Sequence, residues 1–207
     1  PRLMIGSAAS LGAIAEITLR TFARPPDKQT IILFPNSPEQ AEDLLAQILA
    51  SPTTPAYLQA VGGKTFSKHP LQLPSNHTAI ALIIGFLDRP ASCAAQIQTL
   101  RSLPAAKSLE SISQNAAQSG RLRLCMTTEP PIASYHPTPA LGFRIQALSS
   151  QVTALIHAIE HPSSPNNPAN PPQSWIVAEA ATGFLRGSLA SPNPLQHLRE
   201  MISQHSP

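Results

Sequence analysis

Residues Thr30–Leu49, TIILFPNSPEQAEDLLAQIL, join a buried strand to a well-marked helix and set the pattern for the rest of the chain. The run TIILF is continuously apolar, which favours a strand covered on both faces. Ser37 then stands at an N-cap position, Pro38 at the first helical position, and Gln40 completes a capping box. Helical spacing after that predicts one buried face, made of Ala41, Leu44, Leu45, Ile48 and Leu49.

The order of elements that begins with this strand and helix occurs twice in the chain. Strand, helix, strand, strand, helix is predicted from near residues 30, 39, 56, 78 and 90, and again from near 141, 150, 174, 184 and 195. No residue identity accompanies the repeat, so it is a repeat of architecture only. Each half reads as a ferredoxin-like unit. The predicted fold is α+β: two such halves in one antiparallel sheet with helices packed on one face.

Local signals place further elements around these. The helix from residue 90 should bury Cys93 (or Ala94), Ile97 and Leu100, and Ser149 or Ser150 should cap the helix that buries Val152, Leu155, Ile156 and Ile159. Residues 181–183 predict a hairpin turn. Residues 107–118 have weak helical character, with Leu109 and Ile112 on one side, and the alternation in 121–126 predicts an edge strand.

Composition argues against several classes of function. The net charge is +3, but the 14 Lys and Arg residues are scattered singly, without the aromatic partners of a nucleic-acid groove. No window is apolar enough for a membrane span. Cys93 and Cys125 lack metal spacing, which favours free thiols over a disulfide and predicts a reducing, cytoplasmic location. The histidines lack the spacing of a metal set, so no metal site is predicted.

Four residues are candidates for contact with a substrate. Tyr135 and His136 stand together in a proline-rich segment and could hydrogen-bond a carboxylate or take a proton from a carbon beside it. Arg144 and Arg186 each fall within a predicted strand, where a guanidinium could bind a carboxylate through two hydrogen bonds. The alternative for Tyr135 and His136 is a solvated loop with one ring packed down, and for the two arginines it is solvent exposure on the polar face of the sheet.

The stretch that reads as a cofactor-facing element lies at the beginning of the chain. Residues 6–20, GSAASLGAIAEITLR, form a small-residue turn followed by a predicted strand over 13–20, in which Ile17 and Leu19 alternate with polar residues. Such a turn lets backbone N–H groups and the hydroxyls of Ser7 and Ser10 approach a ligand closely. A plain connecting turn is the alternative.

This stretch resembles the end of the FAD-binding domain in FAD-linked oxidases of the vanillyl-alcohol oxidase type, where the pattern is close to G-S-x-G-T-L-G-x-I-T-x-x-T-L-R. The matching positions are Gly6, Ser7, Leu11, Gly12, Ile14, Thr18, Leu19 and Arg20. Ala9, Ser10 and Ala15 stand where the family has Gly, Thr and Thr. Within the family, the layout is most similar to that of the FAD-binding subunit of glycolate oxidase.

The resemblance implies a division of the chain and a cofactor. Residues 1–26 would end a FAD-binding domain, and residues 27–207 would form the cap that covers the flavin on the substrate side. The residues along the FAD would be Gly6, Ser7, Ser10, Gly12 and Ile14. The parent enzyme would oxidise a 2-hydroxy acid such as glycolate or lactate, together with other oxidase subunits, and the chain by itself would bind FAD weakly or not at all.

A second hypothesis gives the chain no catalytic role. In it, the duplicated ferredoxin-like domain binds a small ligand or a partner subunit. A Gly-rich segment for the flavin diphosphate, encoded upstream, would favour the enzyme over this binding module.

Overall fold

The computed structural model describes residues 15–21, 23–62, 80–115, 141–160 and 173–190, and the single positions 12, 119, 199 and 203. Within these ranges the strands are β1 (Asp27–Phe34), β2 (Tyr57–Gly62), β3 (Ile80–Asp88), β4 (Glu110–Gln114), β5 (Leu141–Gln146), β6 (Gln173–Glu179) and β7 (Phe184–Ala190). The helices are α1 (Pro38–Ala50), α3 (Pro90–Ser102) and α6 (Val152–Glu160), the last preceded by a 3₁₀ turn, η1 (Ser149–Gln151).

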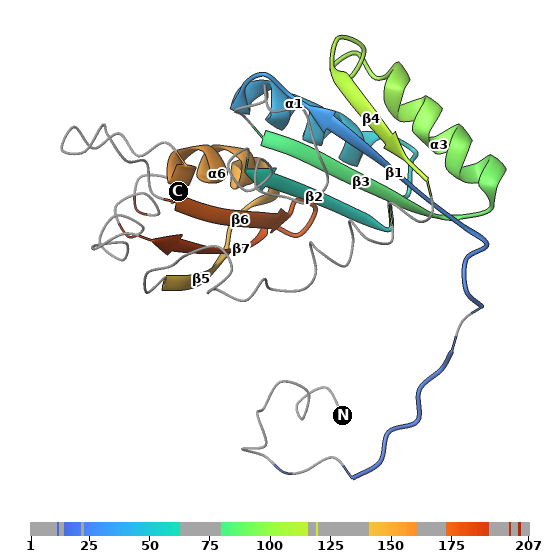
Figure 1. The fold of residues 1–207 in the computed structure, drawn as a ribbon, viewed down its shortest axis with the longest axis horizontal. Helices are drawn as coiled ribbons and strands as arrows, with labels where there is room; N and C mark the ends of the chain where they lie inside the picture. Colours follow the sequence, from blue (N-terminus) through green and yellow to red (C-terminus); the bar gives the residue numbers. More distant parts are fainter. Residues whose placement is uncertain are drawn as a thin grey trace.

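The seven strands form one sheet in the order β4-β1-β3-β2-β6-β7-β5 (Figure 1). All the neighbouring pairs are antiparallel. The first half supplies β4-β1-β3-β2, which is the strand order of a ferredoxin-like unit, and the second half supplies β6-β7-β5. The halves meet where β2 pairs with β6, with Ala60 opposite Ala178 and Val61 opposite Val177. The predicted α+β sheet built from two halves is confirmed.

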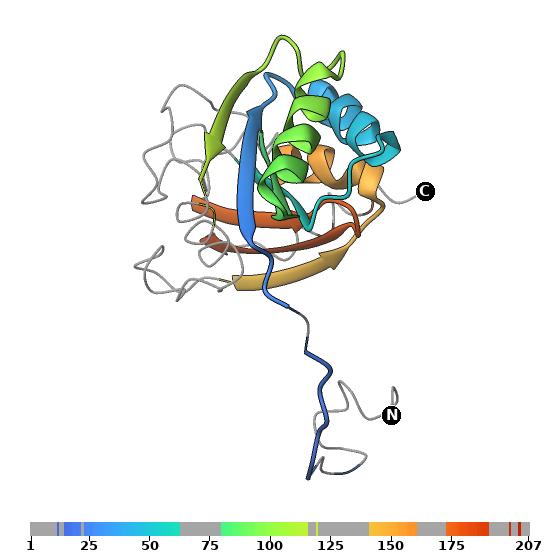
Figure 2. The ribbon, with the colours of Figure 1, turned by 90° about the vertical axis from the view of Figure 1, so that its right-hand side faces the viewer.

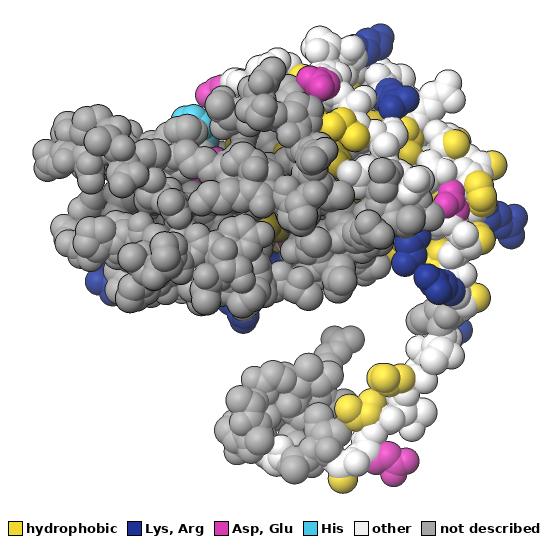
Figure 3. Space-filling model, in the orientation of Figure 1, with side chains coloured by type: hydrophobic (Ala, Val, Ile, Leu, Met, Phe, Trp, Pro, Cys, Tyr) yellow, Lys and Arg dark blue, Asp and Glu magenta, His cyan; other side chains and the backbone are white. Residues whose placement is uncertain are grey.

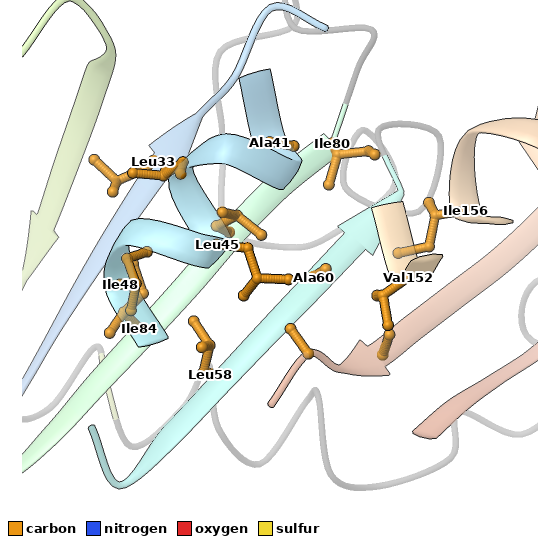
Figure 4. Packing of buried hydrophobic residues seen from close by; sticks show 14 of the residues in the cluster. Leu33, Ala41, Leu45, Ile48, Leu58, Ala60, Ile80, Ile84, Val152 and Ile156 are labelled. Atoms are coloured by element: carbon orange, nitrogen blue, oxygen red, sulfur yellow. The ribbon is translucent and has the colours of Figure 1, made fainter. Parts of the chain in front are cut away.

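The three helices pack on the same face of the sheet (Figure 2). Apolar residues of alternate strand positions and of all three helices make a single core between the two layers. Figure 4 shows Leu45 and Ile48 of α1 beside Leu58 and Ile84 of the sheet, with Ile156 of α6 in the same cluster. One core therefore serves both halves.

Strand β1 is buried on both faces, as its apolar run predicts. Ile31 and Leu33 face the helices, whereas Ile32 and Phe34 belong to a second apolar cluster on the opposite face. Helix α1 begins as expected, because the Oγ of Ser37 accepts a hydrogen bond from the N–H of Gln40 at 3.2 Å. The predicted buried face of α1 is one residue too wide, since the side chain of Leu49 is 48% exposed.

The described part of the segment 107–118, residues 107–115, does not form the expected helix. Glu110–Gln114 instead forms strand β4, which pairs with the edge of β1 and places Ile112 opposite Ile32. The weak helical periodicity is overridden because the open edge of β1 satisfies the backbone N–H and C=O groups of this segment. The edge strand predicted over 121–126 lies outside the described residues, as does the last helix apart from positions 199 and 203.

The expected strand over 13–20 is also wrong in its described part. Residues 15–21 have no secondary structure, and the side chains of Ile17 and Leu19 are 64% and 78% exposed. Figure 1 shows this arm running away from the sheet before β1. Alternation of apolar and polar residues supplies only the pattern of a strand, and a strand also needs a neighbour for its backbone hydrogen bonds. No described strand lies beside the arm.

The beginning of α6 differs from the expectation in its cap. Ser149 and Ser150 lie inside η1, and the residue at the N-cap of η1 is Leu148, whose side chain makes no capping bond. A 3₁₀ turn satisfies the first backbone groups here, with the N–H of Gln151 donating to the carbonyl of Leu148 at 2.9 Å. The buried face of α6 contains Val152, Leu155, Ile156 and Ile159, as predicted.

Candidate functional site

The face of the sheet opposite the helices, called here the helix-free face, changes character from one half to the other. Its central part is apolar and buried, and consists of Ile32, Phe34, Val61, Ala81, Ile83 and Val177. Toward β7 and β5 the same face carries polar side chains, of which Ser188 is buried, Arg186 is half-buried, and Arg144 and Gln146 are exposed. The polar part of this face is therefore the candidate site for binding a polar ligand.

Strand register brings Arg144 and Arg186 together on this face. The two residues stand directly opposite each other on β5 and β7, and Arg186 is opposite Val177 of the helix-free cluster. Their sequence neighbours Ile145 and Leu185 pack into the core on the helix side. Because side chains alternate between faces along a strand, both guanidinium groups project from the helix-free face. Arg144 is exposed and Arg186 is half-buried.

Two like charges in this arrangement have an electrostatic consequence. Directly opposite residues of an antiparallel pair have their Cβ atoms about 5 Å apart, and like charges there are destabilising. Both arginines also take part in an interaction within the structure, so neither is without a partner. A carboxylate is well suited to the position, because guanidinium groups bind carboxylates through two parallel hydrogen bonds.

A carboxylate of the protein lies next to this pair. Glu179 is on β6, two residues beyond Val177, and is therefore the diagonal neighbour of Arg186 on the same face. Gln59 of β2 stands directly opposite Glu179, and its Nε2 donates to Oε1 of Glu179 at 2.6 Å. Gln59 is buried and Glu179 is half-buried. We call Arg144, Arg186, Glu179 and Gln59 the arginine–glutamate site.

A second polar contact on the same face joins β2, which carries Gln59, to β1. The hydroxyl of Tyr57 lies 2.6 Å from Oγ1 of Thr30, which is fully buried. The ring of Tyr57 covers Gly85, the residue opposite it on β3. The contact therefore spans β2, β3 and β1 and fixes the strand that carries Gln59.

Of the predicted site residues, the structure describes Gly12, Arg144 and Arg186. Gly12 is exposed and has a φ of 146°, a backbone conformation that L side chains rarely adopt. In Figure 1 the arm joins the beginning of β1 at the right of the view, whereas β5 and β7 lie at the left. The other predicted positions lie outside the described residues: Gly6, Ser7, Ser10, Ile14, Tyr135 and His136.

Glu179 and Gln59 were missed by the sequence reasoning. A signal for Gln59 was available, because it is the only polar side chain between apolar neighbours in the otherwise buried strand Leu58–Val61. Such a side chain needs a partner when it is buried. No local signal identified the partner, which lies 120 residues away in the sequence.

The remaining groups with reactive chemistry do not join this site. Cys93, on the buried side of α3, is a free thiol in the core, and burial raises its pKa, so it is not an activated nucleophile. In the described ranges no group of three or more His, Cys, Asp or Glu residues could hold a metal ion. None of the helices in the described part of the chain is long and apolar enough to cross a bilayer.

The charged side chains visible on the described surface are distributed over several places rather than gathered in one patch (Figure 3). Apolar side chains lie exposed along the arm in the same view, in agreement with the exposure of Ile17 and Leu19. Neither feature resembles the continuous basic stripe of a nucleic-acid interface.

No protein-family model and no curated protein matches the sequence. Comparison with solved structures does find the fold. An alkyldihydroxyacetonephosphate synthase is similar with a TM-score of 0.55 and 11% identity over 89% of this chain and 40% of that one. A chitooligosaccharide oxidase is similar with a TM-score of 0.50 and 12% identity over 90% of this chain and 45% of that one. The chain thus spans less than half the length of either structure, and its fold is that of a part of each of these two proteins.

Proposed function

We propose that the chain is the C-terminal part of an FAD-dependent oxidoreductase. In this proposal residues 1–26 end the flavin domain, and residues 27–207 are the cap that covers the substrate. The observation that supports this proposal is that two independent features agree. The stretch 6–20 resembles the end of the flavin domain in FAD-linked oxidases, and it leads into a sheet whose fold is similar to part of an oxidase and part of a synthase.

Among the proposed FAD contacts the structure describes Gly12, whose geometry supports a place beside a cofactor. Gly12 is exposed, has no Cβ, and holds its backbone in a conformation that few other residues adopt. A ligand can therefore approach the main chain closely at this position. Gly6, Ser7, Ser10 and Ile14 are proposed to complete the contact. When bound, FAD would supply the two-electron acceptor that amino acid side chains lack.

The substrate proposed for the cap is a 2-hydroxy acid of the glycolate or lactate type. Arg144 and Arg186 are proposed to bind its carboxylate, because they stand opposite each other and a guanidinium group can hold a carboxylate through two parallel hydrogen bonds. Tyr135 and His136 are further proposed contacts on the substrate side. Other oxidase subunits are proposed as partners, by the resemblance to the glycolate oxidase subunit.

The absorption spectrum of the longest natural form of the protein tests the proposal. We expect the visible absorption of a bound flavin, the group that would supply two-electron chemistry. Addition of glycolate or lactate without oxygen should bleach it. The Arg186→Gln variant should keep the absorption and require a higher concentration of acid for bleaching, since one carboxylate contact is removed.

Absence of flavin from that natural form, after reconstitution with added FAD, would contradict the proposal. The duplicated sheet would then be a binding module without redox chemistry. Flavin that is bound but not bleached by any 2-hydroxy acid would contradict the substrate class alone.

A further inference from the structure

We propose that the arm, residues 15–21, pairs with the arm of a second copy of this chain. In the pair the two arms run antiparallel across a twofold axis and form a two-stranded ribbon, with Thr18 of one copy opposite Thr18 of the other. The inference concerns assembly and goes beyond the proposed function, since it depends neither on FAD nor on a substrate.

The arm exposes the apolar side chains of a strand. All of residues 15–21 are exposed, and the side chains of Ile17 and Leu19 are 64% and 78% exposed. These are the two most exposed large apolar side chains in the described part of the chain. An extended backbone places them on one face and Glu16, Thr18 and Arg20 on the other. A segment of this kind is a template for pairing with another chain.

The order of side chains in the arm is complementary to itself when two copies run antiparallel. With Thr18 opposite Thr18, Glu16 of each copy stands opposite Arg20 of the other. In the same register Ile17 stands opposite Leu19. Opposite charges, hydroxyl pairs and apolar pairs are the cross-strand contacts that stabilise a sheet. A twofold axis at Thr18 produces all of them together, as an isologous interface requires.

Other arrangements of the two arms lose these pairs. A shift of the register by two residues sets Thr18 opposite Glu16 or Arg20, so that the opposite charges no longer meet directly. A shift by one residue brings polar side chains onto the apolar face. A parallel pair sets Glu16 beside Glu16 and Arg20 beside Arg20, which is repulsive. The charge pattern therefore favours a second copy, running antiparallel, as the partner.

The pairing is compatible with what Arg20 already does. Arg20 takes part in an interaction within the chain. Its side chain is exposed, and a guanidinium group carries five N–H donors. The carboxylate of Glu16 from a second copy is therefore added to that interaction and does not have to replace it.

The size of the ribbon sets the strength of the dimer. An isolated two-stranded ribbon is marginally stable in water, so we expect a reversible dimer in the micromolar to millimolar range. The proposed FAD contacts, which end at Ile14, precede the arm in the sequence. Pairing of the arms and contact with a cofactor thus use different residues.

Sedimentation velocity of the complete 207-residue chain, measured from micromolar to millimolar concentration, tests the inference. We expect a concentration-dependent exchange between monomer and dimer. Ile17→Asp should weaken the dimer by about tenfold or more, because it puts a charge on the apolar face of the ribbon. Leu148→Asp is the matched control, at a side chain that is 59% exposed outside the arm, and should have no effect. A chain that is monomeric throughout, or a dimer that Ile17→Asp leaves unchanged, would overturn the inference.

Charge reversal tests the register. Glu16→Arg sets cations opposite each other and Arg20→Glu sets anions opposite each other, so each single variant should weaken the dimer by about tenfold. The double variant Glu16→Arg/Arg20→Glu exchanges the partners and should restore the wild-type dissociation constant. Lys107→Glu, at an exposed position outside the arm, should change nothing. A double variant as weak as the single ones would refute the register.

Cross-linking at the twofold axis provides an independent measurement. Directly opposite residues of an antiparallel pair have Cα atoms about 4.5–5.5 Å apart, a separation that a disulfide spans. Thr18→Cys should therefore form a covalent dimer on mild oxidation, whereas Glu16→Cys should cross-link only when mixed with an Arg20→Cys chain. The wild-type chain, with Cys93 and Cys125, is the control for the native thiols. Thr18→Cys that yields no more covalent dimer than the wild type would contradict the pairing.

Discussion

At the scale of single residues, two glycines on the helix-free face differ in what surrounds them. A Cβ added at Gly85 would overlap the ring of Tyr57, whereas one added at Gly142 would meet nothing within 4 Å. We expect Gly85→Ala to destabilise the protein by about 1–3 kcal/mol, because the ring must move and give up its contact with Thr30. Urea unfolding monitored by circular dichroism measures the change.

Gly142→Ala is the control for that substitution, since both glycines lie in strands of the same sheet. An alanine there should be neutral or stabilise by a few tenths, up to about 1 kcal/mol, through the unfolded state. Equal effects at the two positions would mean that the Tyr57 ring does not lie over Gly85.

At the scale of one element, the beginning of helix α3 is stabilised by the carboxylate of Asp88, and the side chain of the N-cap residue takes no part. Arg89 occupies the N-cap without a side-chain bond, and the carboxylate of Asp88 accepts instead from the hydroxyl of Ser92 at 2.5 Å and from the N–H of Arg89 at 2.7 Å. The hydrogen bond from Ser92 has the larger effect, and together the two bonds hold the pKa of Asp88 below its usual value. The ionised carboxylate therefore stabilises the beginning of α3.

The sign of the pKa shift gives a pH dependence. A carboxylate with a lowered pKa in the folded state contributes stability above its ordinary pKa, about 4, and this contribution is lost as the pH falls through the folded-state pKa. We expect Asp88→Asn to lower the urea midpoint at pH 7 and to make little difference once the pH is well below 4. A constant Asp88→Asn effect down to low pH would show that the charge is not responsible.

At the scale of the whole molecule, the two halves share one core and one sheet. Ile156 of α6 is fully buried in the cluster that also contains residues of α1 and β3. We expect Ile156→Ala to cost about 2–5 kcal/mol and to lower the stability of both halves together. Fluorescence of Trp175, the single tryptophan, reports β6, and far-UV circular dichroism reports every element, so their unfolding midpoints should coincide.

Leu148→Ala serves as the comparison, because Leu148 stands next to the same helix with a side chain that is 59% exposed. Its effect should stay within about 0.5 kcal/mol. Two separate transitions in the wild-type chain, one for each method, would show that the halves unfold independently.

Features that depend on near neighbours in the chain could be predicted from the amino-acid sequence. The buried run of β1, the Ser37 cap of α1, the turn before β7 and the buried face of α6 were all predicted, because backbone geometry and side-chain periodicity act over a few residues. The repeated order of these elements was enough to predict the double α+β sheet. The same local signals failed at β4 and at the arm, where the presence or absence of a partner strand decides the structure.

Which polar residues lie together depends on how the strands pair in the folded sheet, and no local pattern reveals it. Arg144 and Arg186 were candidates as separate residues, and the register of β5 with β7 made them a pair. Gln59 and Glu179 meet because β2 and β6 join the two halves, a contact between segments far apart in the chain. Strand register is fixed by packing across the whole sheet, and a shift by one residue would turn each of these side chains to the other face.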